Sequence, residues 1–467
     1  MPKDILLNAA VSRSLKPVDP LVDSFADSLP VSLKAPSDVA CGSSDIVAEP
    51  SRRSFLKQAG ACVGVALAAS KAPFVYAKKQ VTLRVLGTHV TLQEELRQRA
   101  MADLGINIIY EAKGSAAVLQ KASLMPSSFD LYEQWSNSIN ILWQAGTIQP
   151  IDKTRLNHWG EVNPLTKTGK LTPEAKLGAG DAPYKLLYVQ PDGRLGSNST
   201  DNLSFLPYVH NVDSFGYNLN EIPRGVPYTT ESWGWLLDDR YRGKVGIVNA
   251  PTIGLFDLAL AAQAQGLVKF NDIGAMSRVE LDQLFSVLAE KKQRGHFAGF
   301  WNSVPESVNY MKTGRVVLES MFSPAVSALN GLNVPVVYAA PKEGYRGWHG
   351  VMCLSSKAEG HVADAAYDYM NWWQSGWPGA FIARQGYYIS NAERSRELLS
   401  ADEWAYWYDG KESKKELRGT DGNIAVRAGD IRTGGSYLKR FSNVAVWNTV
   451  MPTYDYSLQK WYEFITN

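Results

Sequence analysis

The sequence predicts an α/β protein built from two lobes, and three observations support this fold class. Residues 81–144 alternate strand-like and helix-like segments, and a second β/α series begins at Lys244. A less regular stretch rich in glycine and proline, residues 171–194, separates the two series. Strands that alternate with helices form parallel sheets covered by helices. Two such lobes facing each other make a cleft that closes on a ligand by hinge bending.

The first series has the expected periodicities. Residues 81–86 alternate and are rich in β-branched and apolar side chains, which predicts a strand that ends at Gly87. Apolar residues at spacing four, from Leu92 to Leu104, predict a helix that Gly105 ends. The series continues with strands at residues 106–110 and 129–132 and a helix that begins at Ile139.

The second series begins with a strand at residues 244–248, followed by a helix that opens near Pro251. Leu281, Leu284, Phe285 and Leu288 form an apolar stripe of helical spacing. Further strand-like segments lie at residues 207–209, 214–218, 315–319, 334–338 and 350–354, and a final helix is expected near residues 458–464.

The sequence of the N-terminal region predicts a targeting signal. Residues 51–57 read Ser-Arg-Arg-Ser-Phe-Leu-Lys, which has the pattern of a twin-arginine signal. The apolar run that follows is far shorter than the roughly 20 residues of a membrane span. Small residues at positions 75–77 fit signal peptidase, so we expect a mature chain from Lys78 in the periplasm. Residues 1–50 read as a disordered leader.

The composition excludes some classes of protein and favours others. The net charge is only +2, so no nucleic-acid partner is expected. The 14 Trp and 22 Tyr residues fit a cleft that holds small molecules by stacking and hydrogen bonding. Of the three cysteines, only Cys353 lies after the signal, and its apolar neighbours predict a buried structural thiol.

Several motifs, in this order and spacing, resemble one family. Residues 129–131, 135–137 and 146–152 read FDL, WSN and GTIQPID, and residues 232–233 and 240–245 read SW and RYRGKV. Residues 341–344 read PKEG and precede Trp348, and residues 386–391 read GYYISN. Together they resemble the periplasmic solute-binding proteins of ABC importers, of the spermidine/putrescine type.

The resemblance implies the two-lobed periplasmic binding protein fold of type II, with a ligand cleft between the lobes and no catalysis. It implies a small-molecule solute and an ABC permease in the inner membrane as partners, with no cofactor and no metal. We expect a monomer. The implied organisation is a leader and signal at residues 1–77, lobe 1 at 78–210, lobe 2 at 216–341, a return to lobe 1 at 346–395, and a C-terminal helical tail across the lobes at 396–467.

Ligand-facing positions follow from the resemblance, residue by residue. The turns after the first-lobe strands and the second-lobe helix start carry most of them, and Arg346 lies beside the crossing tryptophan. The full set is Thr88, His89, Trp135, Ser136, Asn137, Asn249, Thr252, Phe322, Arg346, Trp348 and Tyr387.

The chain departs from the polyamine binders at the places where they resemble one another in carrying carboxylates. Those places hold Asn249, Ala250 and Gly350 here. A buried diammonium ligand needs such charges, because an unpaired ion in a cleft costs several kcal/mol. We therefore predict a smaller or less cationic solute, for example one with a carboxylate.

Two other functions stay open from the sequence. An exported hydrolase or other enzyme could use the same cleft, although no nucleophile elbow, phosphate loop or dinucleotide fingerprint occurs. A loaded binding protein could also report to a sensor. No His or Cys pair has metal-ligand spacing, and Glu231 with residues 238–239 is expected on a solvated face and turn.

Overall fold

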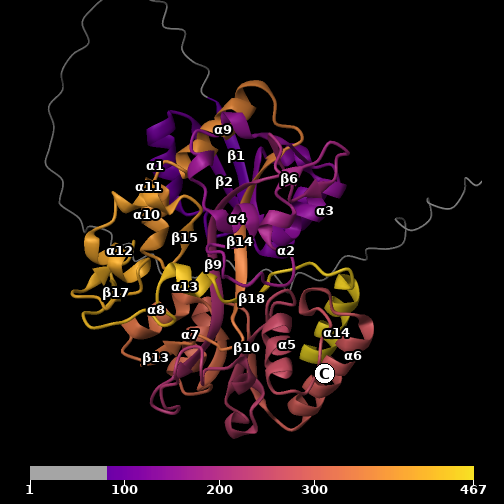
Figure 1. The fold of residues 1–467 in the computed structure, drawn as a ribbon, viewed down its shortest axis with the longest axis vertical. Helices are drawn as coiled ribbons and strands as arrows, with labels where there is room; N and C mark the ends of the chain where they lie inside the picture. Colours follow the sequence, from indigo (N-terminus) through magenta and orange to yellow (C-terminus); the bar gives the residue numbers. More distant parts are fainter. Residues whose placement is uncertain (1–80, 467) are drawn as a thin grey trace, which may run out of the picture. The chain divides into compact units, whose positions relative to one another are not determined.

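The computed structural model describes residues 81–466 and has the mixed α/β, two-lobed fold that the sequence predicts (Figure 1). The predicted signal at residues 51–77 lies outside the described residues. The main sheet has 12 strands, eight of which follow the order β11-β10-β12-β9-β14-β3-β1-β2. None of the helices within residues 81–466 is long and apolar enough to cross a bilayer.

The first lobe is built on three parallel strands, and their connections are helices. β1 (Thr82–Gly87) lies between β2 (Asn107–Ala112) and β3 (Leu131–Trp135). Two helices, α1 (Glu94–Leu104) and, after β3, α3 (Ile139–Gln144), confirm the predicted ones, whereas α2 (Ser115–Leu124), between β2 and β3, was not predicted. Gly105 ends α1 with a positive φ of 66°, as its position predicts.

The second lobe repeats this arrangement. β10 (Val245–Val248) lies parallel between β11 (Phe297–Trp301) and β12 (Leu318–Met321). The helices are α5 (Gly254–Ala264), α6 (Arg278–Gln293), α7 (Val304–Lys312) and α8 (Ser323–Gly331). The predicted apolar stripe on α6 is buried.

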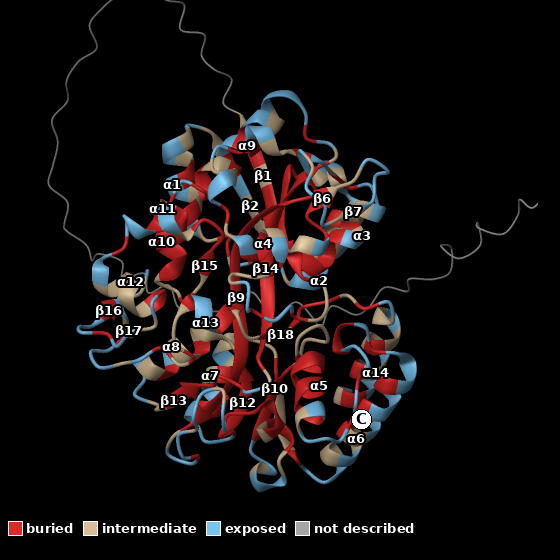
Figure 2. Ribbon diagram, in the orientation of Figure 1, coloured by how far each residue is buried: buried red, intermediate tan, exposed pale blue. Residues whose placement is uncertain are grey.

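Two long antiparallel strands, β9 (Leu206–Asn218) and β14 (Tyr345–Ser355), connect the lobes. β9 pairs with β14 along its first half and with β12 and β13 (Val336–Tyr338) along its second half. Every residue of both strands is buried, which Figure 2 shows as two red ribbons between the lobes. We call their central parts, residues 210–214 and 346–350, the waist.

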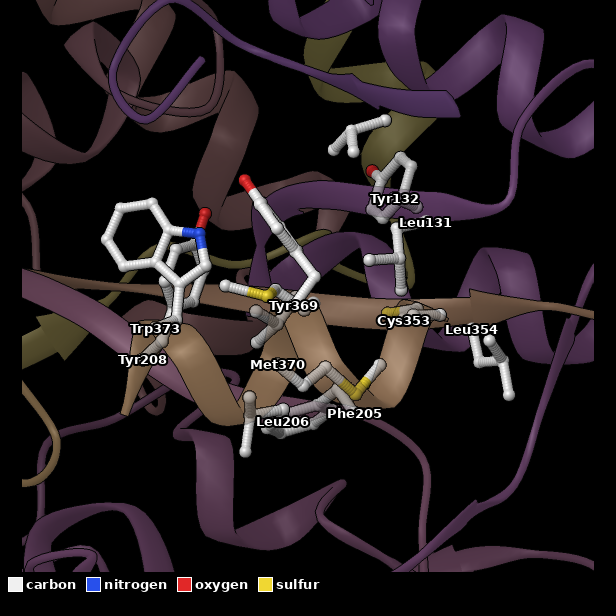
Figure 3. Packing of buried hydrophobic residues seen from close by; sticks show 14 of the residues in the cluster. Leu131, Tyr132, Phe205, Leu206, Tyr208, Cys353, Leu354, Tyr369, Met370 and Trp373 are labelled. Atoms are coloured by element: carbon white, nitrogen blue, oxygen red, sulfur yellow. The ribbon is translucent and has the colours of Figure 1, made fainter. Parts of the chain in front are cut away.

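Separate apolar clusters fill the two lobes. The first-lobe cluster takes its side chains from residues 83–209 and 348–389, and Cys353 is buried in it as predicted (Figure 3). The second-lobe cluster takes most of its side chains from residues 215–339. The first-lobe cluster needs α9 (Gly360–Trp373), and the second-lobe cluster needs Trp461 and Phe464. Neither core therefore comes from one continuous stretch of chain.

Residues after 396 divide between two regions. A third cluster contains Trp407, Tyr437 and Phe441, whereas Trp461 and Phe464 enter the second-lobe core. β18 extends the sheet beside β14. The elements are α12 (Ala401–Trp407), β16 (Leu417–Arg418), β17 (Ile424–Val426), α13 (Tyr437–Phe441), β18 (Val444–Trp447) and α14 (Tyr454–Thr466).

Shorter elements complete the chain. They are α4 (Pro164–Thr168), α10 (Trp377–Ala383), α11 (Ala392–Arg396), β4 (Ile148–Gln149), β5 (Ile151–Asp152), β6 (Tyr188–Val189), β7 (Leu195–Gly196), β8 (Asn202–Leu203) and β15 (Tyr388–Ile389).

Glu231 corrects one expectation, because the prediction of a solvated face is wrong there. Its side chain is buried and accepts hydrogen bonds from the Tyr217 hydroxyl at 2.7 Å and from the backbone N–H of Ala340 at 2.5 Å. A buried carboxylate with two donors replaces its lost hydration. Glu231 thus ties β9 to the segment after β13.

Trp461 tests whether α14 completes the second-lobe core. Its side chain is fully buried, whereas the neighbouring Tyr462 is 42% exposed. We expect Trp461→Ala to lower the free energy of unfolding by about 3–5 kcal/mol, because it leaves a large cavity. Tyr462→Ala is the control and should change it by less than about 0.5 kcal/mol. Urea unfolding followed by circular dichroism measures both, and equal losses would contradict this role of α14.

Candidate functional site

The strands of both lobes end beside the waist. β3 ends at Trp135, which lies opposite Gly350 of β14. β12 ends at Met321, opposite Ser214 of β9. Ligands of open α/β sheets bind beyond the carboxyl ends of the strands. The waist is therefore the place in the fold where residues of both lobes can meet one ligand.

Three of the predicted site residues form a row of aromatic side chains at the waist. The ring centroids of Trp135 and Trp348 are 4.8 Å apart, and those of Trp348 and Tyr387 are 5.6 Å apart. Both contacts are edge-to-face, a favourable arrangement for aromatic pairs. Trp348 is 6% exposed, whereas Trp135 and Tyr387 are half-buried. The partly exposed rings supply flat apolar surface for a solute.

Arg346, also a predicted site residue, is held inside the protein by an ion-pair network. Its Nε donates to Asp257 Oδ1 at 2.7 Å, and its Nη2 lies 3.5 Å from Asp213 Oδ2. Its Nη1 donates to Asn448 Oδ1 at 3.0 Å. Burial raises the pKa of Asp257 to about 6 and also raises the pKa of Asp213, although Arg346 opposes both shifts. The guanidinium joins β14, β9, α5 and the segment after β18.

Two histidines face each other across the waist. His210 of β9 and His349 of β14 stack with centroids 4.8 Å apart. Burial lowers the pKa of His349 to about 4 and that of His210 well below its usual value. His210 Nε2 lies 2.8 Å from the Tyr437 hydroxyl. Both rings are therefore neutral near pH 7 and add no charge to the site.

The other first-lobe positions have different surroundings. Thr88 is buried and His89 is exposed. Ser136 and Asn137 are buried directly after β3, where the Ser136 hydroxyl lies 3.4 Å from the carbonyl oxygen of Asp181. Asn137 Oδ1 has no hydrogen-bond partner among the described residues.

In the second lobe, the three predicted residues follow β10 and β12. The Asn249 amide donates to Asn302 at 2.9 Å and accepts from the Trp461 indole at 3.0 Å, so its hydrogen bonds stay within that lobe. Thr252 is half-buried before α5. Phe322 packs edge-on against Trp301 at 5.1 Å. The structure thus brings Trp135, Trp348 and Tyr387 into contact but does not join Asn249 to them.

Sequence reasoning missed the charged residues that surround the waist. Asp213 lies within β9, and Asp257 is the single charge in the apolar helix α5, which is a signal that could have been noticed. Asp181 lies beside Ser136 and accepts a hydrogen bond from the Val450 N–H at 3.1 Å. Arg432 lies in a C-terminal segment for which the sequence suggested no chemical role.

Glu133, near the end of β3, is another buried carboxyl group. It accepts hydrogen bonds from the Thr91 hydroxyl at 2.8 Å and the Tyr208 hydroxyl at 3.0 Å. Burial raises its pKa to about 7, although these hydrogen bonds act in the opposite direction. Tyr208, which Figure 3 labels, belongs to the apolar cluster of the first lobe.

Comparison with known proteins identifies the family of this chain. Residues 96–429 match the family of bacterial extracellular solute-binding proteins. The chain belongs to this family, as the sequence motifs indicated. No curated protein matches the chain.

Solved structures share the fold. An ABC transporter protein from Clostridium perfringens is 15% identical, with a TM-score of 0.55 over 82% of this chain and 100% of its own. The spermidine/putrescine substrate-binding protein PotD from Streptococcus pneumoniae is 14% identical, with a TM-score of 0.54 over 83% and 100%. The binding protein AgtB from A. tumefaciens R10, in complex with agropinic acid, is 13% identical, with a TM-score of 0.50 over 83% and 99%.

Glu133→Gln should remove a pH-dependent contribution to stability. Between pH 4.5, the usual pKa, and about 7, the folded protein keeps a proton that the unfolded chain has released. This contribution is therefore present at low pH and is lost as the pH rises. We expect the free energy of unfolding of the variant, relative to wild type, to rise by roughly 3 kcal/mol between pH 4.5 and 8.

Urea unfolding at several pH values measures this difference. The exposed Glu95 provides the control, Glu95→Gln, which should show no such trend. A difference between Glu133→Gln and wild type that is independent of pH would show that folding does not shift the pKa of this carboxyl group.

Proposed function

We propose that this protein is the solute-binding component of an ABC importer, which captures a small solute between its lobes and delivers it unaltered to an inner-membrane permease. Membership of the extracellular solute-binding family supports this proposal. The single observation that carries it is the aromatic row of Trp135, Trp348 and Tyr387 at the waist. Stacking surfaces at a hinge suit reversible capture, since they hold a solute without reacting with it.

The site of action that we propose is the periplasm, reached by the twin-arginine route. The signal at residues 51–57 and the small residues at 75–77 support it. We further propose that the protein acts as a monomer, with lobe 1 at residues 78–210 and 346–395, lobe 2 at 216–341, and the tail at 396–467 packing across both.

We propose that the solute is not a polyamine. PotD from Streptococcus pneumoniae is a spermidine/putrescine binding protein, but AgtB was solved with agropinic acid, so one fold serves solutes of different charge. Two buried carboxylates at the waist, Asp213 and Asp257, both interact with Arg346. A dication there would compete with an internal guanidinium for these carboxylates. These carboxylates are therefore not free to pair with a diammonium solute, which favours a less cationic solute.

The alternative of an exported hydrolase has no specific observation in its favour. A glycosidase, for example, needs two carboxyl groups free to act on a substrate. Asp213 and Asp257 instead share Arg346 as an internal partner. Recovery of a bound solute in unchanged form would exclude the hydrolase, and its conversion would overturn our proposal.

Calorimetry against spermidine, putrescine and a panel of carboxylate metabolites tests the solute class. We expect a carboxylate to bind and neither polyamine to bind with micromolar affinity. Trp348→Ala should weaken binding by roughly 10-fold or more, because it removes the central ring of the row. Trp159→Ala, which changes a tryptophan outside the row, is the control. Micromolar binding of putrescine or spermidine would contradict the proposed solute class.

Export can be tested separately. The double variant Arg52→Lys and Arg53→Lys keeps the charge of the signal but removes the arginine pair. We expect the protein to accumulate in the cytoplasm, as measured by immunoblots of fractionated cells. Arg13→Lys, in the leader, is the control and should leave export unchanged. Normal periplasmic amounts of the double variant would argue for another route.

A further inference from the structure

Arg432 lies between β17 and α13 and carries a buried charge. Its side chain is 7% exposed. Its Nη2 donates to the carbonyl oxygen of Gly386 at 3.0 Å, and its Cζ lies 4.9 Å from the Tyr388 ring and 4.7 Å from the Trp407 ring. Its Nη1 is buried and has no hydrogen-bond partner among the described residues.

No carboxylate within residues 81–466 forms an ion pair with Arg432, and the same holds for the nearby Arg440. Arg440 donates instead to the carbonyl oxygen of Thr433 at 2.9 Å and lies over the Tyr345 ring. Burial lowers the pKa of Arg432. A buried guanidinium without an anion is costly, since carbonyl groups and aromatic faces replace only part of its hydration. An anion is the kind of partner that would offset this cost.

The Gly386 carbonyl places Arg432 next to the aromatic row. It accepts hydrogen bonds from both Arg432 Nη2 and Asn211 Nδ2, and Asn211 lies opposite Trp348 in the paired strands of the waist. The next residue, Tyr387, packs against Trp348. The Gly386 carbonyl thus links Arg432 to the backbone next to Tyr387, and the guanidinium itself packs against Tyr388 and Trp407.

The second lobe brings the start of α8 to the same place. A Cβ at Gly386 would lie 2.9 Å from the Oγ of Ser323, the first residue of this nine-residue helix. The N-cap residue is Phe322, which has no side-chain acceptor. Pro324 has no N–H and the Ala325 N–H donates to the Phe322 carbonyl oxygen at 2.9 Å, so the Ser323 N–H is the donor of the first turn that has no partner among the described residues. Helix N-termini carry partial positive charge and attract anions.

We propose that Arg432 and the N-terminus of α8 bind the carboxylate group of the solute, with Arg432 as a specificity-determining residue. The inference rests on the proposed solute-binding function and names the group that recognises the solute. Arg432 lies beyond residue 429, where the match to the family ends. The C-terminal segment of this chain thus supplies a cation that the motifs of the first 429 residues do not.

The probes are 4-aminobutyrate and putrescine, which carry a carboxylate and an ammonium group, respectively, at the corresponding end, and acetate as a small carboxylate. We expect acetate and 4-aminobutyrate to raise the Tm of the wild type above its value in chloride of equal ionic strength, and putrescine to have no effect. Arg432→Gln should weaken 4-aminobutyrate binding by roughly 10- to 100-fold, because the variant loses a hydrogen-bonded charge pair with the carboxylate.

Arg418→Gln is the matched control, since Arg418 is exposed on the same C-terminal segment. Circular dichroism checks the fold of each variant. If Arg432→Gln does not fold, Arg432→Lys decides: it keeps the charge but loses the planar fork of donors. Weaker binding of 4-aminobutyrate by Arg432→Lys supports the inference, and unchanged affinity overturns it.

Two results overturn the inference without touching the proposed function. In the first, acetate, 4-aminobutyrate and chloride give the wild type the same Tm, while another solute binds and its binding is weakened by Trp348→Ala. The other is equal affinity of the wild type and Arg432→Gln for 4-aminobutyrate. If no member of the metabolite panel binds at all, the proposed function fails, and this inference fails with it.

Discussion

The ion pair between Arg346 and Asp257 is the interaction on which the waist depends. Arg346 projects from a strand that both lobes share, and Asp257 lies in the first turn of α5, in the second lobe. Removing one member of a buried pair costs about 3–5 kcal/mol, because the other charge then lacks a partner. β14 and α5 consequently move together. The pair therefore anchors the start of β14 to α5 of the second lobe.

Much of the fold could be predicted from the sequence because its signals are local. The stripe on α6 and the glycine that ends α1 depend only on neighbouring residues. β9 was harder, because Pro207 and Gly216 suggest interruptions, whereas both lie inside one 13-residue strand. Glu231 was misjudged for a related reason. A charged side chain reads as solvated until distant donors, here Tyr217 and Ala340, are known to surround it.

The site shows the same limit more sharply. Trp135 and Trp348 could be anticipated, since residues at strand ends and at the crossing of the lobes have positions that follow from topology. The partners of the charged groups could not. Arg346 meets a residue 89 positions away, and the amide of Asn249 is engaged by Trp461, 212 positions later. Whether a polar side chain is free for a solute depends on such long-range partners.

The discontinuous cores have a consequence for biosynthesis. The first-lobe cluster is complete only when residues up to 389 are present, and the second-lobe cluster awaits Phe464. Contacts between distant parts of the sequence slow folding, and a nascent chain exposes unburied apolar surface in the meantime. The first lobe can therefore complete its core only after residue 389 has left the ribosome, and the second only near the end of synthesis. Expressing either lobe as a single uninterrupted fragment would yield an incomplete, aggregation-prone core.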